Sequence, residues 1–142
     1  MAGYSGTPLP KKLGIKPGSV VALVGPPPDF ESLLGELPPG ITLTPGIQDG
    51  APFDVIVFFT KKLADLKRRF AAIAQRLNPS GGVWIAWPKK ASGVVTDLTE
   101  DIIRIVGLDE GLVDNKVCAI DDTWSGLRFV VRVKDRPARS RK

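Results

Sequence analysis

Histidine is absent from this chain of 142 residues, and cysteine occurs once, at Cys118. Without histidine the chain has no imidazole for acid–base catalysis and no histidine-ligated metal. A single cysteine can form neither an internal disulfide nor a thiolate metal cluster. Cys118 lies within an apolar segment, which favours a small buried side chain over a reactive thiol. We therefore assign no catalytic residue and no metal site, expect no cofactor, and favour a binding role over an enzymatic one.

Long hydrophobic runs are missing as well. No segment approaches the roughly 18 consecutive apolar residues that a membrane-spanning helix requires. Residues 1–7 lack a basic region followed by an apolar stretch, so we see no signal peptide. Together with the scarcity of cysteine, these absences predict a soluble cytoplasmic protein with no membrane partner. The hydrophobic content of 43% is sufficient for the core of one domain.

The net charge of +5 is confined to the C-terminal end of the sequence. Residues 132–142 contain six basic residues and one acidic residue, whereas residues 1–131 contain fourteen of each. A short basic tail supplies charge without a means of reading bases, so we do not expect specific nucleic-acid binding. An accessory role on nucleic acid through this tail stays open as an alternative.

Apolar patterns of two kinds alternate along the chain. Runs of apolar residues predict strands over these ranges: 19–24, 41–44, 53–60, 83–87, 112–120 and 127–133. Apolar residues spaced three and four apart predict helices over these ranges: 30–37, 61–77 and 97–106, with a single helical turn over 11–14. In the last of these helices we expect four residues to face the core: Leu98, Ile102, Ile105 and Val106. The turn 121–126 is short enough to make the final two strands an antiparallel hairpin.

Strands that alternate with helices are typical of an α/β fold. We predict an open, mostly parallel Rossmann-like sheet with helices on both faces and a C-terminal antiparallel hairpin. The expected organisation is an N-terminal arm over 1–18, the α/β domain over 19–133 and a disordered basic tail over 134–142.

The loop that follows the strand 83–87 supplies the best ligand-binding candidates: Lys89, Lys90, Ser92 and Gly93. In open α/β sheets ligands bind beyond the carboxyl ends of the strands, where this loop lies. Gly93 permits close approach of the backbone to a ligand, and a helix that begins at about Asp97 would point its N-terminus at an anion. The alternative interpretation is a solvated turn whose lysines keep the strand end soluble.

Three polar residues, 114–116, interrupt the apolar strand 112–120. A charged pair inside a sheet is costly unless it is matched. Alternation along a strand places Asp114 and Lys116 on one face and Asn115 on the other. Two interpretations remain open: an ion pair at a strand end or sheet edge, and a polar cluster that faces the Lys89 loop and contributes to its ligand site.

Three segments resemble a class I methyltransferase domain, the Rossmann-like fold that binds S-adenosylmethionine. Residues 15–25 resemble the start of the first strand of that family and its first glycine, 53–57 resemble its fourth strand, and 77–85 resemble its fifth. The expected hairpin matches its last two strands. The segment between the equivalents of its second and fourth strands is too short for another strand and helix, so the resemblance implies a reduced version of the fold.

The loop after the first strand departs from the pattern of this family. A site for S-adenosylmethionine needs a glycine-rich turn whose backbone N–H groups reach the ligand. Here Gly25 is followed by Pro26, Pro27 and Pro28, and proline has no N–H. A hydrogen bond to a charged group contributes about 1.5–3 kcal/mol, so losing two or more would weaken binding by orders of magnitude. We therefore predict a degenerate loop and leave the cofactor-binding residues unassigned.

Four further segments resemble a family of small bacterial proteins described only as a domain of unknown function: 3–9, 87–93, 111–121 and 123–127. This resemblance implies no activity. Our hypothesis is a non-catalytic Rossmann-like module that binds a small anionic ligand or a protein partner. The alternatives are a divergent S-adenosylmethionine-dependent methyltransferase and the nucleic-acid accessory protein.

Overall fold

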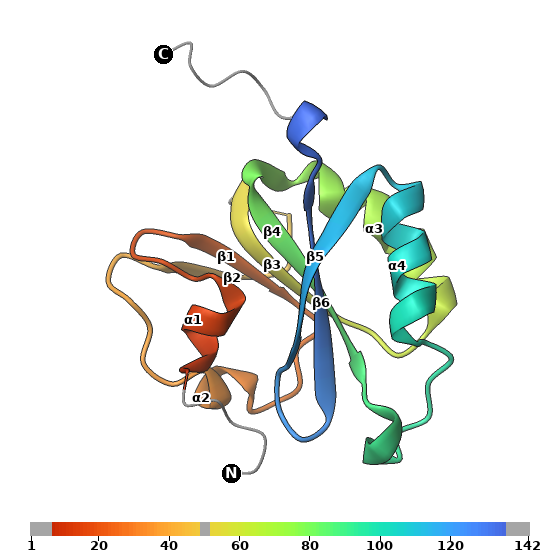
Figure 1. Ribbon diagram of the computed structural model, residues 1–142. Helices are drawn as coiled ribbons and strands as arrows, with labels where there is room; N and C mark the ends of the chain where they lie inside the picture. Colours follow the sequence, from red (N-terminus) through yellow and green to blue (C-terminus); the bar gives the residue numbers. More distant parts are fainter. Residues whose placement is uncertain (1–6, 49–51, 136–142) are drawn as a thin grey trace.

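The computed structural model describes residues 7–48 and 52–135, which form one six-stranded sheet with helices on both faces (Figure 1). The strands are β1 (Val20–Val24), β2 (Thr42–Pro45), β3 (Phe53–Phe59), β4 (Leu77–Pro88), β5 (Leu112–Ala119) and β6 (Trp124–Val131). The α-helices are α1 (Leu9–Leu13), α2 (Phe30–Leu34), α3 (Leu63–Gln75) and α4 (Glu100–Asp109). Two 3-10 turns cover Lys90–Ser92 and Val133–Asp135.

The strand order in the sheet is β2-β1-β3-β4-β6-β5. The first four strands of this order are parallel to one another, and β6 is antiparallel to both β4 and β5. The prediction of an open, mostly parallel α/β sheet that ends in an antiparallel hairpin is confirmed. Between β2 and β3 the described residues form no additional strand, as a reduced fold requires. None of the helices within 7–48 and 52–135 has the length and apolar character to cross a bilayer.

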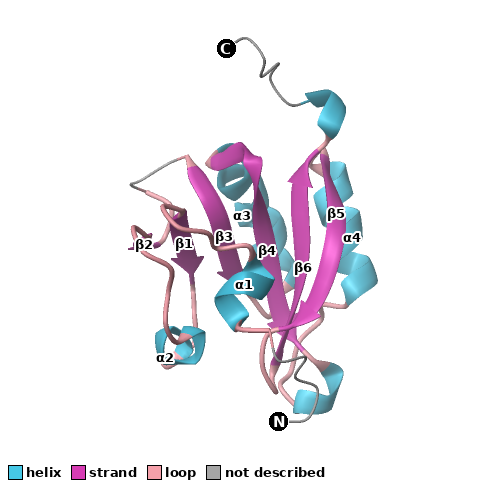
Figure 2. Cartoon of the chain, turned by 60° about the vertical axis from the view of Figure 1, so that its left-hand side comes forward, coloured by secondary structure: helices cyan, strands magenta, loops and turns pink. Residues whose placement is uncertain are grey.

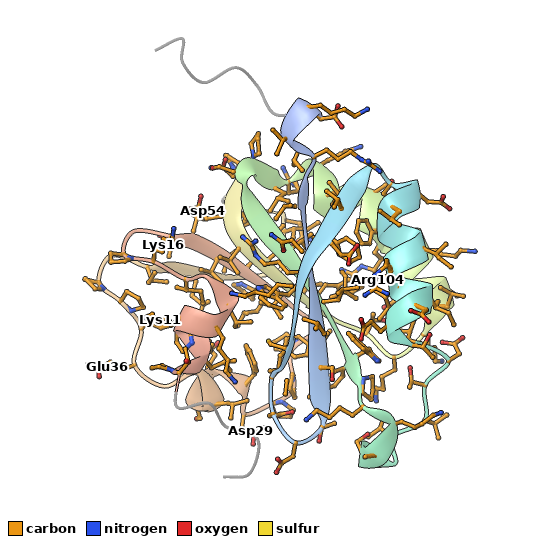
Figure 3. The ribbon with its side chains drawn as sticks, in the orientation of Figure 1. Lys11, Lys16, Asp29, Glu36, Asp54 and Arg104 are labelled. Atoms are coloured by element: carbon orange, nitrogen blue, oxygen red, sulfur yellow. The ribbon has the colours of Figure 1, made fainter. Side chains whose placement is uncertain are left out.

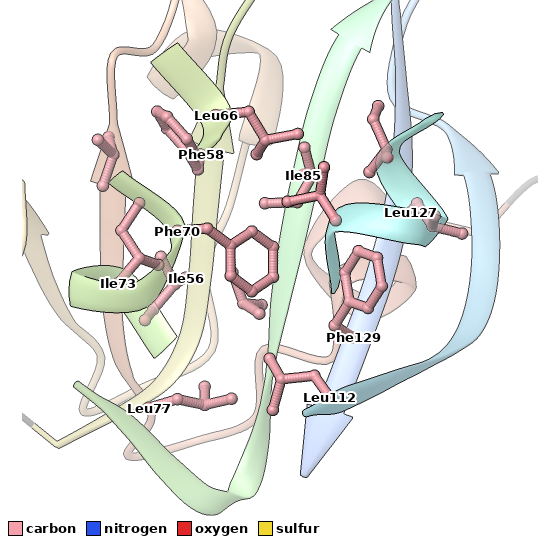
Figure 4. Close-up of a cluster of buried hydrophobic side chains, with 14 of the residues drawn as sticks. Ile56, Phe58, Leu66, Phe70, Ile73, Leu77, Ile85, Leu112, Leu127 and Phe129 are labelled. Atoms are coloured by element: carbon pink, nitrogen blue, oxygen red, sulfur yellow. The ribbon is translucent and has the colours of Figure 1, made fainter. Parts of the chain in front are cut away.

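Helices α3 and α4 cover one face of the sheet, and α1 and α2 cover the other (Figures 1 and 2). The sequence of α3 is amphipathic, and it packs Leu66, Phe70 and Ile73 against the sheet with no more than 1% of each exposed. The ring of Phe70 meets the ring of Phe129 from β6 edge to face, with the ring centroids 5.6 Å apart. Figure 4 shows this cluster, which forms the core on the α3 and α4 face.

The opposite face is organised by Trp84 of β4, which is fully buried. Its indole Nε1 donates a hydrogen bond of 3.0 Å to the carbonyl oxygen of Leu13, the last residue of α1. Leu13 and Ile15 are also buried there. An isolated helix of five residues would not be stable in water, so α1 depends on this packing. Part of the expected N-terminal arm is therefore fixed on the sheet.

Helix α4 begins later than predicted. It starts at Glu100, and the hydroxyl of the N-cap Thr99 accepts a hydrogen bond from the backbone N–H of Ile102. Leu98 is buried, but it lies in the extended segment that precedes the helix. It is therefore not one of the core-facing residues of α4. The spacing of the apolar residues predicted that Ile105 would face the core. This prediction is wrong, because Ile105 is 61% exposed.

Strand β4 begins at Leu77, earlier than the predicted start at residue 83, because residues 78–81 bulge within the strand. Phe53 of β3 pairs with Leu77 and Val55 pairs with Gly82, which shifts the register between these two pairs. The side chain of Asn78 donates a hydrogen bond of 3.1 Å to the carboxylate of Asp54 on β3. The bulge therefore stays attached to the sheet at the amino end of β4.

Candidate functional site

The carboxyl end of β1 is the position at which a Rossmann-like fold holds a nucleotide. Gly25 ends β1 with a φ of +66°, and a Cβ there would lie 3.2 Å from the carbonyl oxygen of Phe59. Prolines 26–28 follow, and the carbonyl oxygen of Pro27 accepts a hydrogen bond of 3.1 Å from the backbone N–H of Phe30, the first residue of α2. The turn therefore contains three consecutive residues without an N–H group.

Three aromatic rings pack beside this loop. The centroid of the Phe30 ring lies 4.8 Å from that of Phe59 at the end of β3, and the Phe59 centroid lies 5.1 Å from that of Trp124 at the start of β6. Both pairs meet edge to face, and only 1% of Phe30 and 5% of Phe59 is exposed. The rings of Phe30 and Phe59 carry no polar atom, so this side of the β1 and β3 ends is mainly apolar.

The cationic loop after β4 lines a hollow of about 630 Å³ together with the N-terminal end of α4. Lys90 and Gly93 form part of its wall. The hydroxyl of Ser92 instead closes the turn, because it donates a hydrogen bond of 2.7 Å to the carbonyl oxygen of Lys89. The backbone N–H of Lys89 is bound to the carbonyl oxygen of Thr123 in the β5–β6 hairpin, at 2.7 Å.

Two carboxylates share this hollow, those of Asp97 and Glu100. Asp97 Oδ1 accepts a hydrogen bond of 2.8 Å from the backbone N–H of Leu63, so it caps α3. The hydroxyl of Thr96 donates a hydrogen bond of 2.6 Å to the carbonyl oxygen of Lys61. The segment before α4 thus holds the N-terminal ends of two helices together. The carboxylates of Asp97 and Glu100 weaken the attraction of the hollow for an anion.

Asp114 and Lys116 lie on opposite faces of the sheet, so the expectation that they share a face is wrong. A β-bulge separates them, since Asp114 pairs with Phe129 and Lys116 pairs with Arg128. Asp114 Oδ2 accepts a hydrogen bond of 2.9 Å from Arg104 Nε on α4, which makes it part of an ion pair. Lys116 lines a groove on the α1 side. The six candidate residues therefore do not form a single site.

That groove has a volume of about 1100 Å³ and lies beside α1 and α2, and we name it the α1 groove. Its charged lining residues are five cations and one carboxylate: Lys11, Lys12, Lys16, Lys116, Arg128 and Glu36. Its apolar wall includes residues from both helices and the adjoining turns: Pro8, Leu9, Ile15, Leu33, Leu37 and Pro38. Figure 3 shows Lys11, Lys16 and Glu36 on this side of the molecule and Arg104 on the other.

A glycine of β4 makes room for the side chain of Arg128 at the edge of the α1 groove. A Cβ on Gly82 would lie 2.4 Å from Nε and 2.6 Å from Nη2 of Arg128, so the guanidinium occupies the space that a side chain would fill. Arg128 Nη1 also donates a hydrogen bond of 3.4 Å to Asn115 Oδ1. Arg128 and Lys16 line a second hollow as well, of about 330 Å³, at the amino ends of β1 and β4. Lys16 and Arg128 therefore belong to the linings of both hollows.

Sequence reasoning missed the α1 groove because its cations come from separate parts of the chain. Lys11 and Lys12 belong to α1, whereas Lys116 and Arg128 belong to the two strands of the hairpin. The balanced net charge of residues 1–131 gave no indication that cations gather on one side. One signal was available in β6: Phe129 is apolar and faces the core, and alternation along a strand then places Arg128 on the opposite face.

The strand order, the antiparallel hairpin and the placement of the helices define the class of this domain as a methyltransferase-like Rossmann fold. A putative type 11 methyltransferase from Sulfolobus solfataricus superposes with a TM-score of 0.62 at 16% identity, covering 89% of this chain and 91% of that chain. A SAM dependent methyltransferase from Aquifex aeolicus gives a TM-score of 0.60 at 14% identity and covers 86% and 87%. The magnesium protoporphyrin IX methyltransferase ChlM from Synechocystis PCC 6803, with bound SAH, gives 0.58 at 12% identity and covers 82% and 75%.

At these identities the likeness shows the fold alone. No protein-family model matches the chain, and no curated protein matches it in sequence. The class I methyltransferase resemblance is therefore confirmed for the fold, and the resemblance to a domain of unknown function stays a prediction.

Proposed function

We propose that this protein is a non-catalytic binding module that keeps the methyltransferase fold, does not use S-adenosylmethionine, and binds an anionic partner in the α1 groove. The observation on which this proposal rests is the run of prolines after Gly25. Two missing N–H donors to a charged ligand would cost about 3–6 kcal/mol, which corresponds to roughly a hundredfold to ten-thousandfold loss of affinity. The edge-to-face packing of Phe30, Phe59 and Trp124 beside the loop supports the same conclusion.

The distribution of charge favours the α1 groove over the loop after β4 as the anion site. The α1 groove is lined by five cations and one carboxylate. The hollow beside Lys90 and Gly93 includes the carboxylates of Asp97 and Glu100. A phosphate or carboxylate would therefore meet an attractive electrostatic potential in the α1 groove and a mixed potential in the hollow beside Lys90 and Gly93.

Isothermal titration calorimetry with S-adenosylhomocysteine tests the cofactor half of this proposal. We expect no measurable binding up to ligand concentrations of about 1 mM, and no greater thermal stabilisation by S-adenosylhomocysteine than by adenosine, which lacks the charged amino-acid part. A dissociation constant at or below about 10 μM would show that the proline loop still holds the cofactor, and the proposal would have to be abandoned.

A divergent methyltransferase is the second candidate function. The fold match to a methyltransferase with bound SAH favours it. This candidate requires S-adenosylhomocysteine to bind more tightly than adenosine, so the same titration separates the two. The accessory role on nucleic acid depends on the tail 134–142, of which residues 136–142 lie outside the described part of the chain, and that role stays a prediction.

A further inference from the structure

We infer that the α1 groove binds an acidic segment of a partner protein, with apolar side chains of that segment packed between α1 and α2. This inference deepens the proposed function and rests on its assignment of the α1 groove as the binding site. The occupant is specified by three properties of the groove: its cations, its apolar wall and its fixed shape.

The cations of the α1 groove come from two directions. Lys11 and Lys16 approach from α1 and the turn that follows it, whereas Lys116 and Arg128 approach from the sheet. An occupant with several carboxylates along its length satisfies both sets, because the two sets lie on different elements. Glu36 is the one carboxylate of the described lining, and it belongs to the turn after α2. Charge complementarity therefore selects an acidic occupant.

The apolar wall of the α1 groove favours an occupant that is more than an anion. Leu33 of α2 is 38% exposed, and Leu9 and Leu37 are half-buried. An inorganic phosphate would satisfy the cations and leave these leucines facing water. A peptide with leucine or similar side chains between its carboxylates covers the leucines as well, in the manner of an amphipathic segment in a groove.

The same wall argues against nucleic acid. Proteins that bind single strands stack the bases on aromatic side chains. The described lining of the α1 groove contains leucines, prolines and one isoleucine, but no aromatic residue. A strand of nucleic acid would have phosphate contacts here and no surface on which to stack its bases.

The α1 wall of the groove is already anchored to the sheet before any partner binds. The hydrogen bond from Trp84 Nε1 to the carbonyl oxygen of Leu13 anchors α1 to the sheet. Gly82 has no side chain, and the Arg128 guanidinium occupies the space this leaves beside the backbone of β4. A preformed site lowers the ordering cost of association, so a short segment can bind with useful affinity.

Fluorescence anisotropy with a designed peptide tests the inference on the full chain. The probe is a fluorescein-labelled peptide of about three helical turns, with glutamates and leucines spaced three and four apart. We expect saturable, salt-sensitive binding that falls at least about tenfold in the double variant Lys11→Glu, Lys16→Glu. Both lysines are exposed, so this variant should fold normally. The matched control is Lys61→Glu with Lys67→Glu, which changes the net charge equally at exposed positions near and on α3 and should leave binding within about twofold.

Two further measurements define the chemistry of the occupant. Leu33→Ser should weaken probe binding several-fold, and a peptide whose leucines are replaced by serine should bind about tenfold more weakly than the original. Equal binding of the serine peptide, tighter binding of a poly-dT strand, or an equal loss in the Lys61 and Lys67 control would each overturn the inference. The S-adenosylhomocysteine titration reports on the proline loop alone. The proposed function and this inference can therefore fail separately.

Discussion

Gly81 and Gly82 are neighbours in β4, and alanine at these two positions should have opposite consequences. An added Cβ on Gly81 would lie 2.4 Å from the carbonyl oxygen of Asp54 and 3.1 Å from its Cα. These are backbone atoms of β3, which is paired on both sides with β1 and β4 and cannot shift freely. Overpacking against such a position typically costs about 1–3 kcal/mol, so Gly81→Ala should be clearly destabilising.

At Gly82 an added Cβ would first meet the end of the Arg128 side chain, with Cζ and Nη2 both at 2.6 Å. A guanidinium at the end of a flexible side chain can rotate away, and alanine loses less backbone entropy than glycine by about 0.5–1 kcal/mol. We therefore expect Gly82→Ala to change the free energy of unfolding by less than about 0.5 kcal/mol. It should nevertheless displace Arg128 and weaken binding of the acidic peptide probe several-fold.

Urea and thermal unfolding followed by tryptophan fluorescence measure the change in stability of each variant. The anisotropy titration measures the change in binding of the acidic peptide probe. A loss of about 2 kcal/mol in Gly81→Ala would lower Tm by about 6–8 °C in a domain of this size. If Gly82→Ala were as destabilising as Gly81→Ala, the guanidinium would be rigidly packed and the reasoning would be refuted. Unchanged probe binding in a folded Gly82→Ala variant would remove Arg128 from the proposed contact.

Three further predictions concern stability and reactivity. Trp84→Phe removes a donor to the buried carbonyl oxygen of Leu13, and leaving it unpaired should cost about 1–3 kcal/mol in urea unfolding, beyond the cost of lost packing. Burial tends to raise the pKa of Asp65, but hydrogen bonds led by that from Arg68 outweigh it and lower the pKa. The stabilisation from Asp65 is thus present above its unfolded pKa of about 3.9 and lost as pH falls through the lower folded value, so Asp65→Asn should show less acid destabilisation below about pH 4. Burial raises the pKa of the Cys118 thiol, so its reaction with a disulfide reagent at pH 7 should be slower than in urea, and an equal rate would contradict this.

The central strands were predictable because helices cover both of their faces. In β3 every residue from Val55 to Phe59 is at most 5% exposed, which requires the continuous apolar run seen in the sequence. The bulge in β5 was not predictable in this way. A one-residue change of register leaves the order of the polar residues 114–116 unaltered and transfers Lys116 to the other face.

The candidate site was predictable only at residues whose effect follows from their own chemical structure and does not depend on the fold. The prolines after Gly25 lack an N–H in any fold, so the sequence is sufficient to identify a loop with few donors. Asp97 was expected at the start of the following helix, but it caps α3 from a position 34 residues after Leu63. Such a contact depends on how the chain returns over the sheet, which local pattern does not reveal. The same dependence on topology concealed the cations of the α1 groove.

The position of β6 has a consequence for the synthesis of this chain. β6 is the last of the strands within the described residues, yet it lies between β4 and β5. During translation β4 therefore has an unpaired edge, and β5 has no neighbouring strand, until Val131 has left the ribosome. Nascent chains that stall before this point display the unpaired edge of β4 to chaperones and proteases, and β4 and β5 are joined through β6 only in one late step.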